Sequence, residues 1–257
     1  MVAKSGKALF LAMAAASALA IAGLSSTAQA SLITGSAAIS NLGTAVPTPG
    51  GADQYDLTAT TGGPDVAKAV SANPINYYTN NTPQPGETFT TGTNATGYNL
   101  GSITVLDVSE DGAFSSSATA YLDIYSIDTS TSTSTQLAAY TTAVLGSSFN
   151  AASGDYLKIS LSTPLVLNSN AVYGYSISTS GSYSGLGVDP QNNYTKGELA
   201  MIRPSSTPNQ LITTSSTYPN AVFDASLTPV TAVPEPATIG LVGLGGLALL
   251  GMKRRKA

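Results

Sequence analysis

The side chains best suited to chemistry in this sequence are oxygen donors that cluster in one short segment. Asp107, Ser109 and Asp111 stand at alternate positions, and Gly112 follows them. This is the first half of an EF-hand calcium loop, in which oxygen ligands precede a glycine at the sharp turn. The twelfth loop position is Ala118, where a bidentate glutamate would be required. An EF-hand is therefore excluded. The segment either binds calcium with ligands from another loop or forms a turn with solvated carboxylates, and we favour the turn.

Paired carboxylates are also what glycoside hydrolysis requires, because one acts as the acid and the other as the base or nucleophile. The candidates nearest to one another in the sequence are Asp107, Glu110, Asp111, Asp123 and Asp128. Nothing in the sequence places two of them on one face. A surface glycosidase is therefore the third and least favoured function.

Composition excludes several other chemistries. The 257 residues contain no His, no Cys and no Trp. Ser-His-Asp and Cys-His nucleophile systems cannot be assembled without these residues, and a zinc site would lack its usual ligands. Disulfide bonds are excluded as well. We therefore predict a protein that is not an enzyme, has no cofactor and no metal, and folds on its own core.

Tyrosine is the remaining residue type that could bind a ligand, since its ring can stack on a sugar and its hydroxyl can hydrogen-bond. The chain has 13 tyrosines. A sugar-binding platform is expected where tyrosines stand beside asparagines, at Tyr77–Tyr78 with Asn80–Asn81, and at Tyr183 or Tyr194 with Asn192–Asn193. The simpler interpretation is that most tyrosines are core or strand-surface residues.

The charge distribution excludes nucleic acid as a partner. Charged residues make up 9% of the chain, against about 25% in ordinary soluble domains. Between Ser31 and Ala232 there are thirteen acidic residues and only four basic ones. Nucleic-acid affinity depends on Lys and Arg that displace counterions from phosphates, so this acidic span would repel it.

Short runs of alternating apolar and polar residues predict the β-strands that must position these groups. The runs are Glu87–Thr91, Ile103–Val108, Tyr121–Tyr125, Leu157–Ser162, Val172–Ile177, Leu199–Ile202 and Val222–Leu227. Turn-forming clusters separate them at Glu110–Gly112, Ser153–Asp155, Asn168–Asn170 and Ser180–Ser182. Val46–Pro64 is expected to be a loop, and Thr129–Thr135 a loop or a weakly specified edge. The pattern predicts an all-β fold, an antiparallel two-sheet sandwich of jelly-roll type, as one domain from about Ala37 to Thr228.

The first thirty residues are typical of a secretory signal peptide. Lys4 and Lys7 form a positive start, and Ala8–Leu24 carries no charge. Ala28 and Ala30 form the small-x-small pattern after which signal peptidase cleaves. We expect residues 1–30 to be removed; the alternative is an N-terminal membrane anchor.

The C-terminus combines three features in a fixed order. A tripeptide precedes an uncharged, mostly apolar run at 237–252, and a basic block follows. The tripeptide is Pro234, Glu235 and Pro236, and the basic block is Lys253, Arg254, Arg255 and Lys256. As a helix the apolar run would span about 24 Å, and snorkelling basic side chains could extend it toward the ~30 Å hydrocarbon core. The basic block places this end in the cytoplasm and the acidic bulk of the chain outside.

This tail resembles the PEP-CTERM sorting signal of Gram-negative bacteria, which is also catalogued under the name of an ice-binding-protein C-terminal domain. The resemblance covers 233–257, about a tenth of the chain. It implies processing by an exosortase, a membrane-embedded cysteine transpeptidase. It also implies export across the inner membrane to the cell surface or beyond, with a transient C-terminal anchor, in an organism that makes exopolysaccharide. The alternative is a plain single-pass anchor, and the ice-binding name is no evidence of ice binding.

A second resemblance lies in the middle of the chain. Gly86–Gly92 resembles the opening of β-sandwich passengers often found with this anchor, although Glu87 stands where Gln is usual. Gly154–Leu157 and Ala171–Tyr175 are similar to segments of the same group. We therefore expect residues 31–230 to be an exported passenger associated with extracellular polysaccharide or biofilm matrix. The alternative is a lectin-like carbohydrate-binding module.

Overall fold

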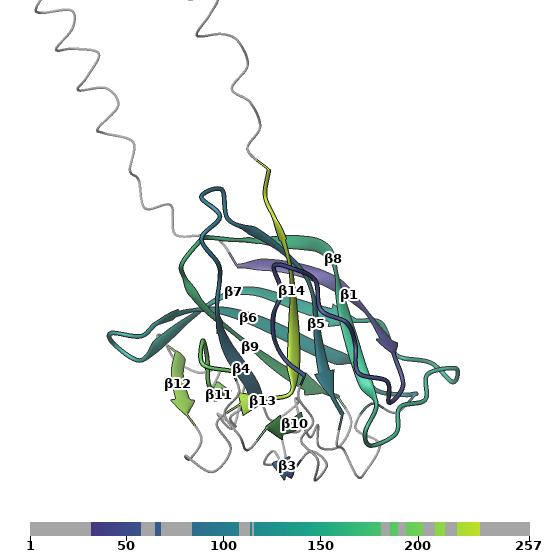
Figure 1. The fold of residues 1–257 in the computed structure, drawn as a ribbon. Coiled ribbons are helices and arrows are strands. Elements are labelled where there is room, and N and C mark those ends of the chain that lie inside the picture. The colour runs from purple at the N-terminus through teal and green to yellow at the C-terminus, as the bar shows by residue number, and fades with distance from the viewer. Residues whose placement is uncertain are drawn as a thin grey trace, which may run out of the picture. The chain divides into compact units, whose positions relative to one another are not determined.

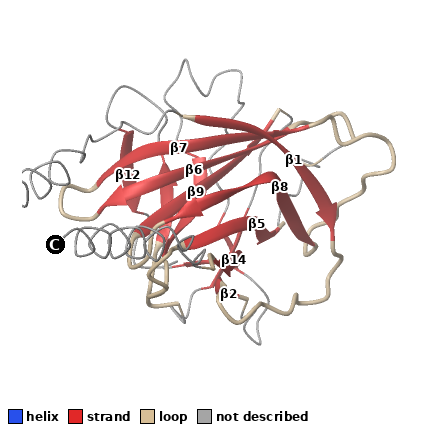
Figure 2. Cartoon of the chain, turned by 90° about the horizontal axis from the view of Figure 1, so that it is seen from above, coloured by secondary structure: helices blue, strands red, loops and turns tan. Residues whose placement is uncertain are grey.

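The computed structural model describes residues 32–57, 65–67, 84–107, 114, 116–180, 186–189, 194–202, 209–213 and 220–231. Apart from Leu32, all of them belong to one compact unit, Ile33–Ala257. Every regular element among them is a β-strand, as Figure 2 shows, so the predicted all-β class is confirmed. The described residues contain no helix that is long and apolar enough to cross a membrane. The predicted signal peptide and the apolar run at 237–252 lie outside the described residues.

Fourteen strands are described, and most of them join one large sheet (Figure 1). They are β1 (Ile33–Asn41), β2 (Gln54–Asp56), β3 (Asp65–Ala67), β4 (Gln84–Thr90), β5 (Tyr98–Leu106), β6 (Ala120–Asp128), β7 (Thr133–Thr142), β8 (Tyr156–Leu167), β9 (Val172–Thr179), β10 (Leu186–Asp189), β11 (Leu199–Ile202), β12 (Asn209–Thr213), β13 (Asn220–Ala221) and β14 (Phe223–Pro229). The large sheet has the order β12-β11-β4-β9-β6-β7-β1-β8-β5-β14-β2. A small sheet has the order β13-β10-β3.

The large sheet is mixed, because β1 runs parallel to β7. The prediction of a purely antiparallel arrangement is therefore wrong at this pair. One edge of β7 is shared between two strands: Ala138–Thr142 pair with β1, and Thr133 and Ser134 pair with β12. Through the second pairing, β12, β11, β4, β9, β6 and β7 close into a ring. The eleven strands of the large sheet thus form one continuous curled sheet. The two-sheet sandwich stays a prediction.

The curl brings distant strands together around a common core. The ring centroids of Tyr175 on β9 and Phe223 on β14 lie 5.9 Å apart, although these strands are not neighbours in the sheet. The core side chains that are at most 1% exposed include Leu100, Ile103, Leu122, Ile124, Leu157 and Ile159. Burying each such side chain contributes about 1.5–3 kcal/mol.

The alternation of apolar and polar residues predicts where the strands lie better than it predicts which of their side chains are buried. On β8 the core side chains Leu157 and Ile159 alternate with the half-buried Lys158, as expected. On β14, however, Asp224 is only 6% exposed, and on β6 Tyr125 is fully buried, so both faces of these strands are covered. The alternating pattern therefore predicted the strands without revealing that their polar face is also buried.

Two segments that were expected to be loops contain strand residues in the structure. Within Val46–Pro64, residues Gln54–Asp56 form β2 by pairing with β14, so the loop prediction is wrong there. Within Thr129–Thr135, a turn that includes Ser132 at φ 54° leads directly into β7 at Thr133. Because β7 is hydrogen-bonded on both sides, the interpretation of this segment as an edge is wrong. The turns predicted around Gly154 and Asn170 are confirmed by their positive φ values.

Candidate functional site

Several residues singled out in the sequence lie outside the described residues. They are Ala28, Ala30, Tyr77, Tyr78, Asn80, Asn81, Ser109, Glu110, Asp111, Tyr183, Asn192, Asn193, Pro234, Glu235, Pro236, Lys253, Arg254, Arg255 and Lys256. The described chain leads toward the tripeptide through β14. Directly after that strand, the carbonyl of Val230 accepts a hydrogen bond from Asn94 Nδ2 at 3.1 Å, and the Val230 N–H donates to the carbonyl of Gly97 at 3.0 Å. The last described part of the chain is thereby tied to the turn before β5.

Of the three calcium-ligand candidates, only Asp107 is described. Its backbone N–H donates to the carbonyl of Asp155 at 2.8 Å, and its carbonyl accepts from Gly154 at 2.7 Å. Its side chain is 3% exposed, so the expectation of a solvated carboxylate is wrong for this residue. The described residues contain no group of three or more carboxylates that could hold a metal ion.

Two of the described carboxylates of the glycosidase hypothesis, Asp123 and Asp128, lie apart. Asp123 and Asp128 are both on β6, where they pair with Ala139 and Thr133 at different points of β7. They are five positions apart along the strand, or about 17 Å, whereas catalytic carboxylates lie no more than about 9.5 Å apart. Asp123 accepts a hydrogen bond from Gln136 Nε2 at 2.9 Å, and Asp128 accepts from Ser130 in the turn. Asp123 and Asp128 therefore do not form the close carboxylate pair that this hypothesis requires.

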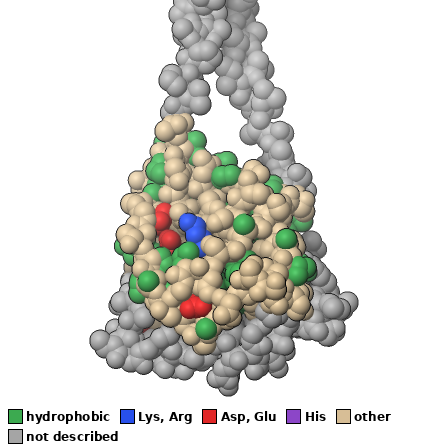
Figure 3. All heavy atoms as spheres, turned by 90° about the vertical axis from the view of Figure 1, so that its right-hand side faces the viewer, with side chains coloured by type: hydrophobic (Ala, Val, Ile, Leu, Met, Phe, Trp, Pro, Cys, Tyr) green, Lys and Arg blue, Asp and Glu red, His purple; other side chains and the backbone are tan. Residues whose placement is uncertain are grey.

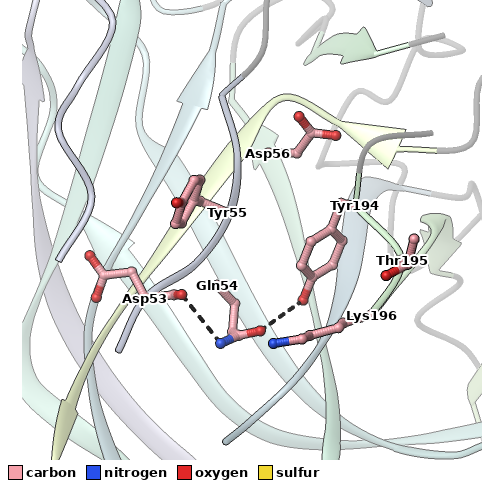
Figure 4. A pocket seen from close by; sticks show the side chains of 7 residues that line it. All are labelled: Asp53, Gln54, Tyr55, Asp56, Tyr194, Thr195 and Lys196. Carbon is pink, nitrogen blue, oxygen red and sulfur yellow. Dashed lines mark hydrogen bonds between the residues drawn. The ribbon is translucent and has the colours of Figure 1, made fainter. Parts of the chain in front are cut away.

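A pocket of about 350 Å³ opens beside the end strand of the large sheet. One wall is β2 with the residue before it. The other wall is the segment Tyr194–Lys196, which lies before β11 and is not itself a strand (Figure 4). The lining residues are Asp53, Gln54, Tyr55, Asp56, Tyr194, Thr195 and Lys196. We call it the edge pocket. Gln54, Tyr194 and Lys196 point toward one another, while Asp53 and Tyr55 lie on the far side of β2 (Figure 4).

The second wall is held in place by β4. Thr90 Oγ1 donates to the carbonyl of Lys196 at 2.8 Å, and the N–H of Glu198 donates to Thr88 Oγ1 at 2.8 Å. A Cβ at Gly197 would overlap the Thr88 carbonyl, so only glycine lets the segment approach β4 this closely. One wall of the edge pocket is therefore supported by β14, which pairs with β2, and the other wall by β4.

Buried polar side chains lie next to the edge pocket. Glu87 on β4 is fully buried, and its Oε2 accepts a hydrogen bond from the N–H of Ala221 at 2.6 Å. Glu87 pairs in register with Tyr175 on β9. Glu87 Oε1 and the Tyr175 hydroxyl are buried without a hydrogen-bond partner. The Tyr194 ring packs edge-on against Phe223 at 5.2 Å. A buried polar atom without a partner is costly, and such atoms are few in native proteins.

The pKa values of this region reflect its low solvent access. Burial raises the pKa of Glu87 well above its usual range, the charges of Asp56 and Glu198 raise it further, and the Ala221 N–H opposes the shift. Burial and the nearby Glu87 also raise the pKa values of Tyr175 and Tyr194. Glu87 is therefore protonated at pH values at which an exposed glutamate is ionised.

The edge pocket was largely hidden from sequence analysis. Tyr194 was the one lining residue singled out, as an exposed sugar platform, yet its side chain is only 7% exposed and its ring packs on Phe223. Asp56 and Tyr194 line the same pocket although they are far apart in the chain. Glu87, where the passengers that this segment resembles have Gln, was the one local signal near this region.

Comparison with known proteins identifies the C-terminal tail. The family model of the PEP-CTERM protein-sorting motif matches residues 232–256, as predicted. A search of curated proteins finds no match to the chain. The motif implies an exosortase as processing partner and indicates sorting to the surface of a bacterial cell.

Proposed function

We propose that this chain is a non-enzymatic passenger, exported to the cell surface and associated there with extracellular polysaccharide or biofilm matrix. Signal peptidase would remove residues 1–30 and an exosortase would process the tail, which anchors the chain in the membrane only transiently. The folded passenger would be residues 31–230, with the two halves of the curled sheet packed as the layers of a sandwich. The observation that carries the proposal is the sorting motif at 232–256.

The surface of the passenger supports a polysaccharide partner. Charged side chains are few on the face in Figure 3, and hydrophobic ones are scattered over it. Large exposed hydrophobic residues include Val144 and Val166, which are 61% and 64% exposed. Protein interfaces usually need a central cluster of aromatic or Arg anchors. Hydroxyl- and amide-rich strands instead offer many weak hydrogen bonds to the hydroxyls of a sugar chain.

Retention on polysaccharide tests the proposal. The full chain, purified in detergent, is passed over immobilised exopolysaccharide from its own host, with immobilised dextran as the control matrix. We expect retention on the host polysaccharide and less on dextran. Nanomolar binding to a host protein, with no retention on the polysaccharide, would contradict the proposal.

A lectin-like module is the second candidate, and the edge pocket favours it. A lectin would recognise a defined sugar, whereas a matrix protein would bind its host polysaccharide through many weak contacts. A glycan array separates the two, because a lectin gives strong signals for a few related glycans. A surface glycosidase is the third candidate, and hydrolysis that disappears when one carboxylate pair is mutated would support it.

A further inference from the structure

We propose that the edge pocket binds one neutral sugar unit of a polysaccharide. This inference deepens the proposed function and rests on the polysaccharide association stated above. Its basis is the chemistry of the two walls, their spacing and the buried polar groups beside them.

The position of the pocket makes it accessible to a polymer. β2 is the last strand of the large sheet, and its pairing partner in that sheet is β14. Among the hydrogen bonds described, Tyr194 Oη to Gln54 Oε1 joins the two walls, and at 3.4 Å it is long for an O–H···O bond. A ligand hydroxyl beside this pair could hydrogen-bond to both atoms at about 2.8 Å. The two walls thus present polar atoms that one ligand hydroxyl can bridge.

The lining chemistry selects the ligand. Lys196 and the Gln54 amide can donate hydrogen bonds, while Asp56 and the Gln54 carbonyl oxygen can accept them. The Tyr194 and Thr195 hydroxyls can do both. An apolar ligand would make no hydrogen bonds to these groups. An anionic sugar would bring its charge toward the carboxylate of Asp56. A neutral polyol satisfies donors and acceptors on both walls.

The volume limits the ligand to a small unit. At about 350 Å³ the pocket lies near the lower end of the ~300–1,000 Å³ range of ligand sites. This is room for one sugar ring, with the rest of a polysaccharide chain left outside. Thr195 and Lys196 are exposed at the opening, whereas Gln54, Asp56 and Tyr194 are buried. The buried three would fix the orientation of the ring, and the exposed two would contact it from the rim.

The neighbouring polar core supports a site at this place. Glu87 is close enough to Asp56 and Tyr194 for their charges to interact. Glu87 Oε1 and the Tyr175 hydroxyl are buried without partners, and buried polar atoms of this kind are few in native proteins.

Calorimetric titration of the full chain in detergent tests the inference. The probes are the methyl glycosides of glucose, galactose, mannose and rhamnose, with methyl glucuronide as the anionic comparison. Lys196→Met and Gln54→Ala are the pocket variants. Lys158→Met on β8 and Gln136→Ala on β7 are the matched controls, since they remove the same functional groups away from the pocket. Circular dichroism and thermal melting verify that each variant is folded.

We expect at least one neutral glycoside to bind, and methyl glucuronide to bind more weakly. Each pocket variant should lower the affinity about tenfold, while the controls stay within about twofold. Binding of none of the four, equal loss in pocket and control variants, or preference for the glucuronide would overturn the inference. Host polysaccharide retention in the same variants separates the two proposals. If retention persists while glycoside binding fails, the pocket assignment falls and the proposed function stands; if the wild-type chain is not retained, the proposed function falls.

Discussion

The sorting tail and the folded passenger carry information in two different ways. The tail, residues 232–256, is recognised from the linear order of a tripeptide, an apolar run and a basic block. The passenger instead brings together residues that are distant in the sequence, such as Asp56, Glu87 and Tyr194. A linear signal can be identified without a fold, whereas a pocket can be identified only with one. It follows that changes in one region should leave the other's behaviour intact.

The largest expected effect is on processing. Replacing Pro234, Glu235 and Pro236 with three alanines should abolish cleavage, because proline disfavours helix at its own position and in the residue before it, and an exosortase is expected to bind an extended chain. Membrane insertion should persist, since the apolar run is unchanged. Immunoblotting of membrane and released fractions measures the result. Continued release of a shortened chain would mean that the tripeptide is not the signal.

A core substitution should lower the stability of the passenger without affecting processing of the tail. Ile159 on β8 is 1% exposed in the main core, so Ile159→Ala should lower the free energy of unfolding by about 2–5 kcal/mol. Urea denaturation of the purified full chain measures this. Processing by the exosortase should be unchanged in cells, provided that the variant still folds there. A variant as stable as the wild type would contradict the described core.

The stability of the passenger should depend on pH because the carboxyl groups of Asp224 and Glu87 are buried. Burial and the charge of Asp53, partly opposed by Lys158, raise the pKa of Asp224 to about 7. The folded chain therefore holds protons on Asp224 and Glu87 that the unfolded chain has already released. The free energy of unfolding should accordingly fall as pH rises from about 4 through about 7.

Asp224→Asn and Glu87→Gln should each flatten this decline, as measured by urea denaturation at several pH values. Asp128→Asn is the control, because hydrogen bonds from Ser130 and Thr131 lower the pKa of that carboxylate, and it is ionised across this range. If both variants kept the wild-type slope, the two carboxyl groups would not be titrating as described.

The smallest effect is expected where the passenger meets the tail. Asn94 Nδ2 donates to the carbonyls of Gly97 and Val230, so Asn94→Ala should cost about 1 kcal/mol of stability. Hydrogen exchange should increase at the amides of Gly97 and Val230. Thr131→Ala in the turn between β6 and β7 is a control that should leave these amides unchanged.

Much of the fold was predictable because many strands show their alternation locally. Leu199–Ile202 was predicted with the bounds that β11 has, and the run at Leu157–Ser162 lies within β8. β1 was missed because its small residues, such as Gly35 and Ala38, carry no strong apolar period. β2 was missed because three residues are too few to form a pattern, and pairing with β14 defines the strand.

The edge pocket was beyond sequence analysis for a physical reason. Its walls, β2 and the segment at 194–196, are brought together by the curl of the sheet, which depends on all the intervening strand pairings. The segment with the calcium-like spacing shows that a local motif can also mislead. Asp107, the one of its three candidate ligands that the structure describes, has a buried side chain directly after β5.

The most direct test of the account is the intact mass of the protein released from wild-type cells that express an exosortase. The account predicts that the basic block and the apolar run are absent from the released protein. The new C-terminus should lie near Pro234–Pro236, and the new N-terminus should be Ser31. Recovery of a chain that still ends in Lys253–Ala257 would contradict processing and leave only a plain membrane anchor.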